Sequence, residues 1–106
     1  MGLFGFSRRP DIHQGLKDFA ADPGALLLDV RSAQEYRDGH IPGSRNLPLR
    51  SLDEIAFIAE HKAIPLYVYC HSGVRSGQAV SQLQDMGYEN VRNIGGIASY
   101  SGNIES

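Results

Sequence analysis

The stretch PLYVYCHSGVRS, residues 65–76, decides the fold and the chemistry that we expect of this chain. Its apolar part, Leu66 to Tyr69, is short and does not alternate with polar residues. Such a run is typical of a strand buried on both faces of a parallel sheet. Cys70 ends the strand, the loop after it contains Gly73, and a helical pattern continues from residue 75 or 76 to residue 86. The stretch therefore predicts a strand, a tight loop and a helix in succession.

Further strands are predicted on both sides of this stretch. Residues 25–30 form a second apolar run, broken only by Asp29, and brief strands are predicted at 45–49 and 91–94. The pair Gly95-Gly96 after the last of these strands predicts a sharp turn near the same rim of the sheet as Cys70. Strands that alternate with helical segments indicate an α/β domain with a mainly parallel sheet.

The helices between the strands have recognisable ends. Asp11 is a suitable N-cap for a helix that ends before the turn Asp22-Pro23-Gly24. Ser32 and Glu35 have the spacing of a capping box. Ser51 is expected to cap a third helix, whose apolar face would contain Leu52, Ile55, Ala56, Ile58 and Ala59. Gly87 occupies the usual position after the end of the helix that follows Cys70.

Length and composition indicate one small domain. The chain has 106 residues, a formal net charge of −2 and scattered basic residues. We expect residues 1–10 to be a flexible lead-in and residues 11–106 to form the domain. The charge balance argues against a nucleic-acid partner, which usually requires a basic stripe.

Cysteine usage and hydropathy bear on the cellular compartment. A single cysteine forms no disulfide within the chain, so a reducing compartment is the natural expectation. The apolar residues near the amino terminus form too short a stretch for a signal peptide, and no apolar run approaches the ~20 residues of a membrane span. We therefore expect a cytoplasmic protein with no membrane partner. The alternative interpretation is a domain from which an upstream or downstream partner domain was cut away.

Cys70 is the candidate nucleophile. A loop that enters a helix directs several backbone N–H groups inward, and together with the helix dipole these groups stabilise an anion such as a thiolate. Arg75 adds a permanent cation, and Gly73 allows the loop to curl. A lone cysteine after an apolar strand is often only a small buried packing residue. The polar, glycine-containing loop favours a reactive thiol, because a packing cysteine has no need of such a loop.

Four groups of motifs, in order, resemble a rhodanese domain. They are LLLDVR at 26–31 with Glu35-Tyr36, GHIPGS at 39–44 with NLP at 46–48, YVYCHSGVRS at 67–76, and Gly87-Tyr88 with Val91, Asn93 and GGI at 95–97. The resemblance extends from about Ile12 to Tyr100. It implies a rhodanese-like α/β fold, with a central, mainly parallel sheet of four to five strands and helices on both faces.

The resemblance also implies an activity, that of a thiosulfate sulfurtransferase. Cys70 would become a persulfide by accepting sulfur from thiosulfate, a thiol persulfide or mercaptopyruvate, and would pass it to cyanide or a thiol without a cofactor. A protein could serve as donor or acceptor. The persulfide would be bound by the loop residues His71, Ser72, Gly73, Val74, Arg75 and Ser76. With no second domain to cover the loop, Cys70 is expected to be exposed.

Several other polar residues have both a structural and a functional interpretation. For Asp29 an internal ion pair or loop-anchoring hydrogen bonds are favoured, whereas Arg31 suits equally a structural carboxylate pair and an anionic donor. His71 is expected to be an exposed loop side chain, His40 a structural turn residue and Glu35 a helix cap. The histidines lack metal-ligand spacing, so no metal site is expected. Tyr100 stands where many relatives carry a tryptophan.

Two other functions remain as alternatives. Cysteine phosphatases and arsenate reductases of related fold place the arginine six positions after the cysteine, whereas Arg75 follows Cys70 by five. The shorter loop is cramped for a tetrahedral oxyanion. A non-catalytic interaction module or a redox sensor is the other alternative, since an exposed thiolate oxidises readily.

Overall fold

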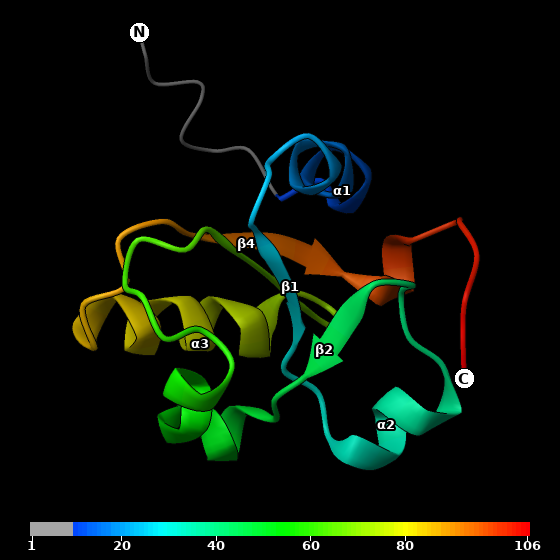
Figure 1. Cartoon of the computed structure of the whole chain (residues 1–106). Coiled ribbons are helices and arrows are strands. Elements are labelled where there is room, and N and C mark those ends of the chain that lie inside the picture. Colours follow the sequence, from blue (N-terminus) through cyan, green and yellow to red (C-terminus); the bar gives the residue numbers. More distant parts are fainter. Residues whose placement is uncertain (1–9) are drawn as a thin grey trace, which may run out of the picture.

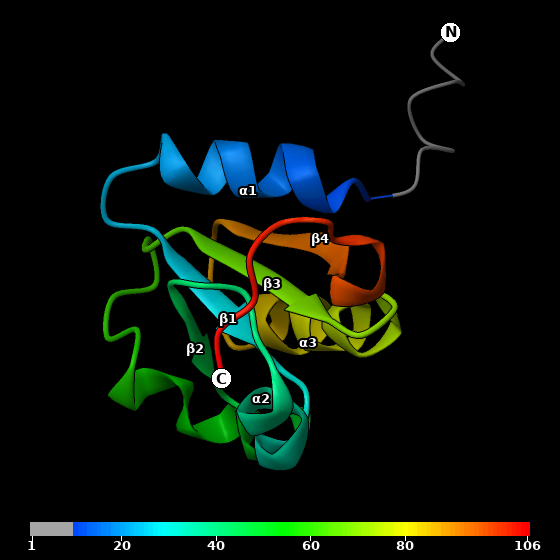
Figure 2. The ribbon, with the colours of Figure 1, turned by 90° about the vertical axis from the view of Figure 1, so that its right-hand side faces the viewer.

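A four-stranded parallel sheet forms the centre of the protein, as seen in a computed structural model that describes residues 10–106. The strands are β1 (Leu26–Asp29), β2 (Ser44–Asn46), β3 (Leu66–Cys70) and β4 (Val91–Gly96), in the order β2-β1-β3-β4. Figure 1 labels β1, β2 and β4, and Figure 2 labels all four strands. All three strand pairs are parallel, which confirms the predicted α/β class. The predicted lead-in falls, apart from Pro10, outside the described residues, and the division into lead-in and domain stays a prediction.

Helices cover both faces of the sheet. Figure 2 shows α1 (Ile12–Ala20) on one face and α3 (Val74–Asp85) on the other. Alternate strand residues pack into two cores, because successive side chains of a strand point to opposite faces. The core beneath α1 contains Ile12, Leu27, Ile41, Tyr67, Tyr69 and Ile94. The core on the α3 face includes Leu28, Val30, Val68, Cys70, Ala79 and Leu83.

The predicted helix ends at Asp11, Ser32 and Gly87 are confirmed. Asp11 caps α1 by accepting hydrogen bonds from two backbone amides of the first turn. Ser32 and Glu35 form the predicted capping box at the start of α2 (Ala33–Asp38). Gly87 follows the C-cap of α3 with a φ of 100°, which favours glycine. These ends fix where the loops around Cys70 begin.

The segment after β2 differs from its prediction. The strand expected at 45–49 is Ser44–Asn46, and Leu49–Phe57 forms η2, a 3-10 helix with a kink at Ser51. Ser51 makes no cap; its amide bonds to the Pro48 carbonyl at 2.8 Å, an i→i+3 bond that tightens the chain immediately after the strand. The tighter winding leaves Ala56 exposed, so it does not belong to the buried face as predicted.

The last strand is longer than predicted and contains the glycine pair. Asn93 is paired with Val68 and Gly95 with Tyr69, so the register shifts by one residue at Ile94. Gly96 then pairs with Cys70. The expected sharp turn at Gly95-Gly96 is therefore wrong, because the bulge absorbs the extra residue and keeps both glycines against β3.

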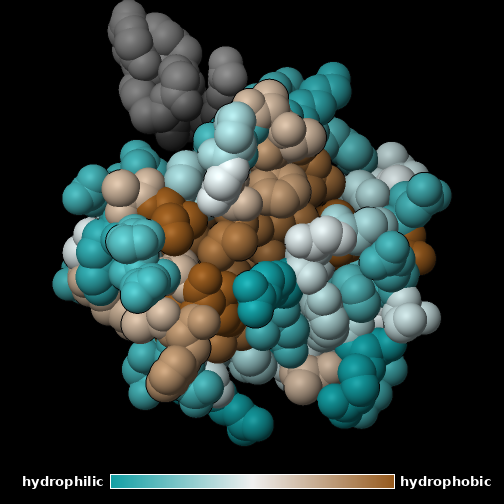
Figure 3. Space-filling model, in the orientation of Figure 1, coloured by the Kyte–Doolittle hydropathy of each residue, from teal (hydrophilic) through white to brown (hydrophobic). Residues whose placement is uncertain are grey.

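Part of the surface is apolar. Figure 3 shows apolar side chains gathered between α1 and η2. Among the described residues, the large apolar side chains that are most exposed are Phe57, Val74 and Ile104.

Within residues 10–106, no helix combines the length and the apolar character needed to span a membrane.

Candidate active site

Cys70 stands where three elements meet. It is the last residue of β3, it pairs with Gly96 of β4, and three residues separate it from the start of α3. The N-cap of α3 is Gly73, with a φ of 100°, a conformation that a residue with a Cβ rarely adopts. The predicted sequence of strand, tight loop and helix is thus present, and the helix starts at Val74, one or two residues earlier than expected.

The sulfur of Cys70 is bound by two donors from the loop and the helix. The amide of Gly73 donates to Sγ at 3.0 Å, and the Ser76 hydroxyl lies 3.4 Å from Sγ. The same hydroxyl lies 2.7 Å from Oδ1 of Asn93. Since a hydroxyl carries one hydrogen, it donates to only one of these acceptors at a time.

The environment of Cys70 lowers the pKa of its thiol below the ordinary value. Burial is the largest single influence and by itself raises the pKa. Hydrogen bonds from the Ser76 hydroxyl and from the amides of Ser76, Gly73 and Ser72 outweigh it, because they stabilise the thiolate. The loop therefore favours the nucleophilic form of the cysteine.

Replacing Ser76 with alanine should raise the pKa of the Cys70 thiol. At a pH below the thiol pKa, less thiolate would be present and alkylation by iodoacetamide should slow on the order of fivefold, the equivalent of one hydrogen bond. At high pH the two rates should converge. Ser81→Ala, on an exposed position of the same helix, is the matched control. An unchanged pH profile for Ser76→Ala would contradict the role of its hydroxyl.

Cys70 is fully buried, so the prediction that it is exposed is wrong. Its side chain points into the core on the α3 face, where Ser76 and the end of β4 cover it. His71 and Ser72 are exposed as expected for loop residues, and the side chain of Val74 is also exposed. The sulfur is therefore covered at the base of a loop whose side chains reach solvent.

Asn93 connects the loop to β4, a function that sequence reasoning did not assign to it. Its Nδ2 donates to the Gly73 carbonyl at 3.0 Å, and its Oδ1 accepts from the Gly95 amide at 3.0 Å. It also contacts the Ser76 hydroxyl. The only signal in the sequence was its place in the closing motif. Asn93 positions the two groups that bind the Cys70 sulfur.

Arg75 forms a bidentate ion pair with Glu35 of α2. The Nη1–Oε1 and Nη2–Oε2 distances are 2.7 and 3.0 Å. The hydrogen bond from Arg75 is the largest cause of the lowered pKa of Glu35, about 2. Sequence reasoning identified Glu35 only as a helix cap, and the pairing of two residues 40 positions apart was missed.

Arg31 is bound to the carboxylate of Asp29. Nη2 of Arg31 lies 2.7 Å from Oδ2 of Asp29, and the same nitrogen donates to the Gly39 carbonyl at 2.7 Å. The internal ion pair expected for Asp29 is present, and both side chains are almost completely buried. The guanidinium braces the loop between α2 and β2. A contact between Arg31 and a sulfur donor stays a prediction.

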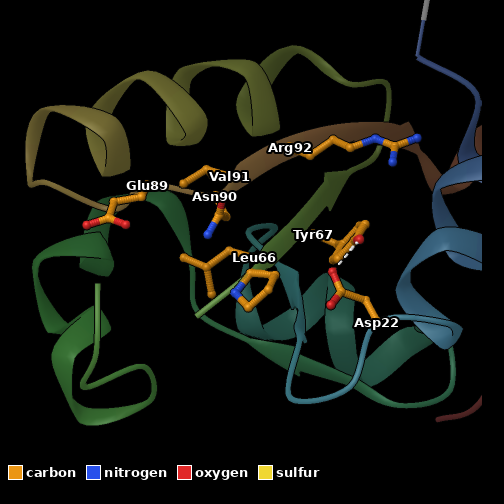
Figure 4. Close-up of a pocket in the computed structure, with 8 residues that line it drawn as sticks. Asp22, Leu66, Tyr67, Glu89, Asn90, Val91 and Arg92 are labelled. Atoms are coloured by element: carbon orange, nitrogen blue, oxygen red, sulfur yellow. Dashed lines mark hydrogen bonds between the residues drawn. The ribbon is translucent and has the colours of Figure 1, made fainter. Parts of the chain in front are cut away.

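A pocket beside the Cys70 loop and a larger pocket lie at opposite ends of the strands. A pocket of about 400 Å³ borders the loop at Gly73, Val74 and Asn93. Another, of about 520 Å³, lies at the amino ends of β3 and β4, where Tyr67 donates to Asp22 at 2.7 Å (Figure 4). Cys70 is at the carboxyl end of β3, so the larger pocket is not part of this site.

In residues 10–106, no group of three potential metal-ligating side chains was found.

Comparison with known proteins identifies the family. The model of the rhodanese-like domain family matches residues 13–103. The chain belongs to the rhodanese-like domain family. The resemblance seen in the motifs and the fold expected from it are therefore both confirmed.

Relatives within this family show a range of activities. The chain is 41% identical over 71 residues to the thiosulfate sulfurtransferase PspE of Escherichia coli. The aligned region covers 66% of this chain and 68% of PspE. It is 33% identical over 86 residues to the tRNA uridine(34) hydroxylase of Escherichia fergusonii, covering 76% of this chain but only 25% of that enzyme. A solved structure described as a rhodanese with anions from E. coli superposes with a TM-score of 0.72 and 34% identity, over 77% of this chain and 98% of that one.

Proposed function

We propose that this rhodanese-like domain is a sulfurtransferase that carries a sulfane sulfur as a persulfide on Cys70. The observation that carries the proposal is the position of the Cys70 sulfur at the start of α3, within reach of the Gly73 amide and the Ser76 hydroxyl. These donors stabilise the thiolate, which is the nucleophilic form of cysteine. The similarity to PspE, named a thiosulfate sulfurtransferase, supports the same reaction class.

The proposed reaction has two half-reactions. With thiosulfate, the Cys70 thiolate bonds to the outer sulfur, the donor's S–S bond breaks, and its electron pair leaves with sulfite. An acceptor such as cyanide or a thiolate then bonds to the terminal sulfur of the persulfide, and the Cys70 thiolate is released. The enzyme alternates between a free Cys70 thiolate and a Cys70 persulfide, so ping-pong kinetics are expected.

The loop would stabilise the charge on the persulfide. In this proposal the anion is bound by the amides and side chains of the loop, His71, Ser72, Gly73, Val74, Arg75 and Ser76. Arg31, next to the loop, is proposed to contact the donor. Small sulfur donors and thiol acceptors, or a protein that carries either group, would be the partners. A reducing cytoplasm would keep the single cysteine a free thiol.

The alternatives differ from the proposal in what they require of the site. A redox sensor would form an oxygen adduct on Cys70 in place of cyanide-labile sulfur, and burial of Cys70 restricts oxidants and sulfur donors alike. The five-residue spacing from Cys70 to Arg75 and the engagement of Arg75 by Glu35 argue against a phosphatase, which needs its arginine for the oxyanion.

Intact mass after incubation with thiosulfate tests the proposal. We expect a gain of about 32 Da, one sulfur atom, which disappears when cyanide is added, because cyanide takes the terminal sulfur of a persulfide. A gain of about 16 or 32 Da that cyanide does not remove would indicate oxidation. A folded protein with a titratable thiol and no cyanide-labile adduct from any sulfane donor would contradict the proposed function.

A further inference from the structure

The two arginines of the proposed site are both bound to carboxylates. Arg75 makes two hydrogen bonds to Glu35, at 2.7 and 3.0 Å, in a bidentate arrangement. Arg31 is paired with Asp29 in the same way, at 2.7 to 3.1 Å. A guanidinium in such a pair presents much less positive potential to an incoming anion than a free one does. The site therefore presents less positive potential to a strongly anionic donor than unpaired arginines would.

Glu35 is held in place by α2 as well as by Arg75. Its Oε1 accepts a hydrogen bond from the Ser32 amide at 3.0 Å, as part of the capping box. A pKa of about 2, due first to the hydrogen bond from Arg75, keeps the carboxylate ionised at every pH near neutrality. Because the cap fixes the side chain independently, the arrival of a donor does not by itself release Glu35 from Arg75.

The surface next to the pair carries a further acidic group. A pocket of about 420 Å³ beside the loop is lined by Arg31, Glu35, Asp38 and His71, among others. Arg50 is exposed in a pocket on the other side of Arg75, where water and salt screen its charge. Two carboxylates thus border the pocket that His71 reaches, and its one arginine is already paired.

We propose that Glu35 is a specificity-determining residue, which screens Arg75 and so disfavours dianionic sulfur donors relative to donors with one negative charge or none. This inference rests on the proposed sulfurtransferase function. The cap and the charge of Glu35 are separable, since glutamine also accepts the hydrogen bond of a capping box. Glu35→Gln should therefore preserve α2 while it removes the screening charge and one of the two hydrogen bonds to Arg75, because an amide nitrogen does not accept a hydrogen bond.

Two donors that differ by one charge provide the test. Thiosulfate is a dianion, and methanethiosulfonate is a monoanion of similar shape, with a methyl group in place of one oxygen. With either donor the Cys70 thiolate bonds to the outer sulfur, the donor's S–S bond breaks, and the electron pair leaves with sulfite or methanesulfinate. Thiocyanate formed from cyanide would give kcat/KM for each donor.

Glu35→Gln should raise the ratio of kcat/KM for thiosulfate to that for methanethiosulfonate about threefold. This is the effect of one unit charge on another on the order of 6 Å away in a water-like dielectric. Glu89→Gln, which removes the same charge at the amino ends of the strands, should leave the ratio unchanged (Figure 4). Thermal unfolding would verify that both variants are folded.

Wild-type protein provides a measurement that needs no variant. Because Arg75 is screened, kcat/KM for thiosulfate should change less than about twofold between roughly 20 and 200 mM salt, whereas a free guanidinium would give a steep fall. Two results would overturn the inference and leave the proposed function intact. One is sulfur transfer by Glu35→Gln with an unchanged ratio of kcat/KM for thiosulfate to that for methanethiosulfonate. The other is a steep salt dependence of kcat/KM for thiosulfate in the wild type. No sulfur uptake from either donor would overturn both.

Discussion

Cys70→Ser should lose sulfur transfer on the order of a thousandfold or more. The loss is this large because a serine hydroxyl neither ionises near neutral pH nor forms a stable sulfur adduct, and removing a nucleophile usually costs orders of magnitude in rate. The fold should survive, since the hydroxyl can accept the hydrogen bond that the Gly73 amide now donates to Sγ. Thiocyanate production from thiosulfate and cyanide, together with thermal unfolding, would measure both effects.

A second variant would test whether position matters as well as chemistry. Ser72 is exposed in the same loop, so Cys70→Ser combined with Ser72→Cys places a thiol two residues away from the original one. That thiol would lie outside the donors that reach Sγ, and we expect no measurable turnover. Turnover near the wild-type level in this double variant would show that any thiol on the loop suffices, contrary to the role assigned to the Gly73 amide and the Ser76 hydroxyl.

Features encoded by neighbouring residues could be predicted from the sequence. The buried strand β3, the loop after Cys70 and the capping box of Ser32 and Glu35 all depend on residues within a few positions of one another. Local hydrogen bonds and apolar patterning determine such features, and no alternative packing competes with them. The position of Cys70 at the carboxyl end of a central strand followed from the same patterns.

Features that depend on packing between distant segments were not predicted. The pair of Glu35 and Arg75 joins the starts of two helices, and either residue alone is compatible with a solvent-exposed side chain. Burial of Cys70 depends on β4 reaching Gly96, which required a bulge that no local pattern signals. The 3-10 form of η2 likewise reflects the turn that the chain makes after Pro48.

The contact between Gly96 and the loop is a second point at which the site should fail. A Cβ built on Gly96 would lie 2.6 Å from the carbonyl carbon of His71 and 2.7 Å from Cα of Ser72. Both are backbone atoms, and the His71 carbonyl is also held by the Ala98 amide at 3.0 Å. The φ of Gly96 is −132°, so the requirement for glycine is one of space and not of backbone conformation.

Gly96→Ala should therefore lower kcat/KM for sulfur transfer about a hundredfold and stability by about 1–3 kcal/mol, the usual cost of overpacking. The loop would have to move away from β4 and carry the Gly73 amide off the Cys70 sulfur, so alkylation of Cys70 near neutral pH should also slow. Gly24→Ala is the control: its φ of 82° disfavours alanine, but no atom lies within 4 Å of the added Cβ. That variant should lose about 1 kcal/mol of stability and keep its activity. Near-normal sulfur transfer in Gly96→Ala would mean that the loop tolerates displacement from β4, and that the hydrogen bonds around Cys70 do not control its reactivity.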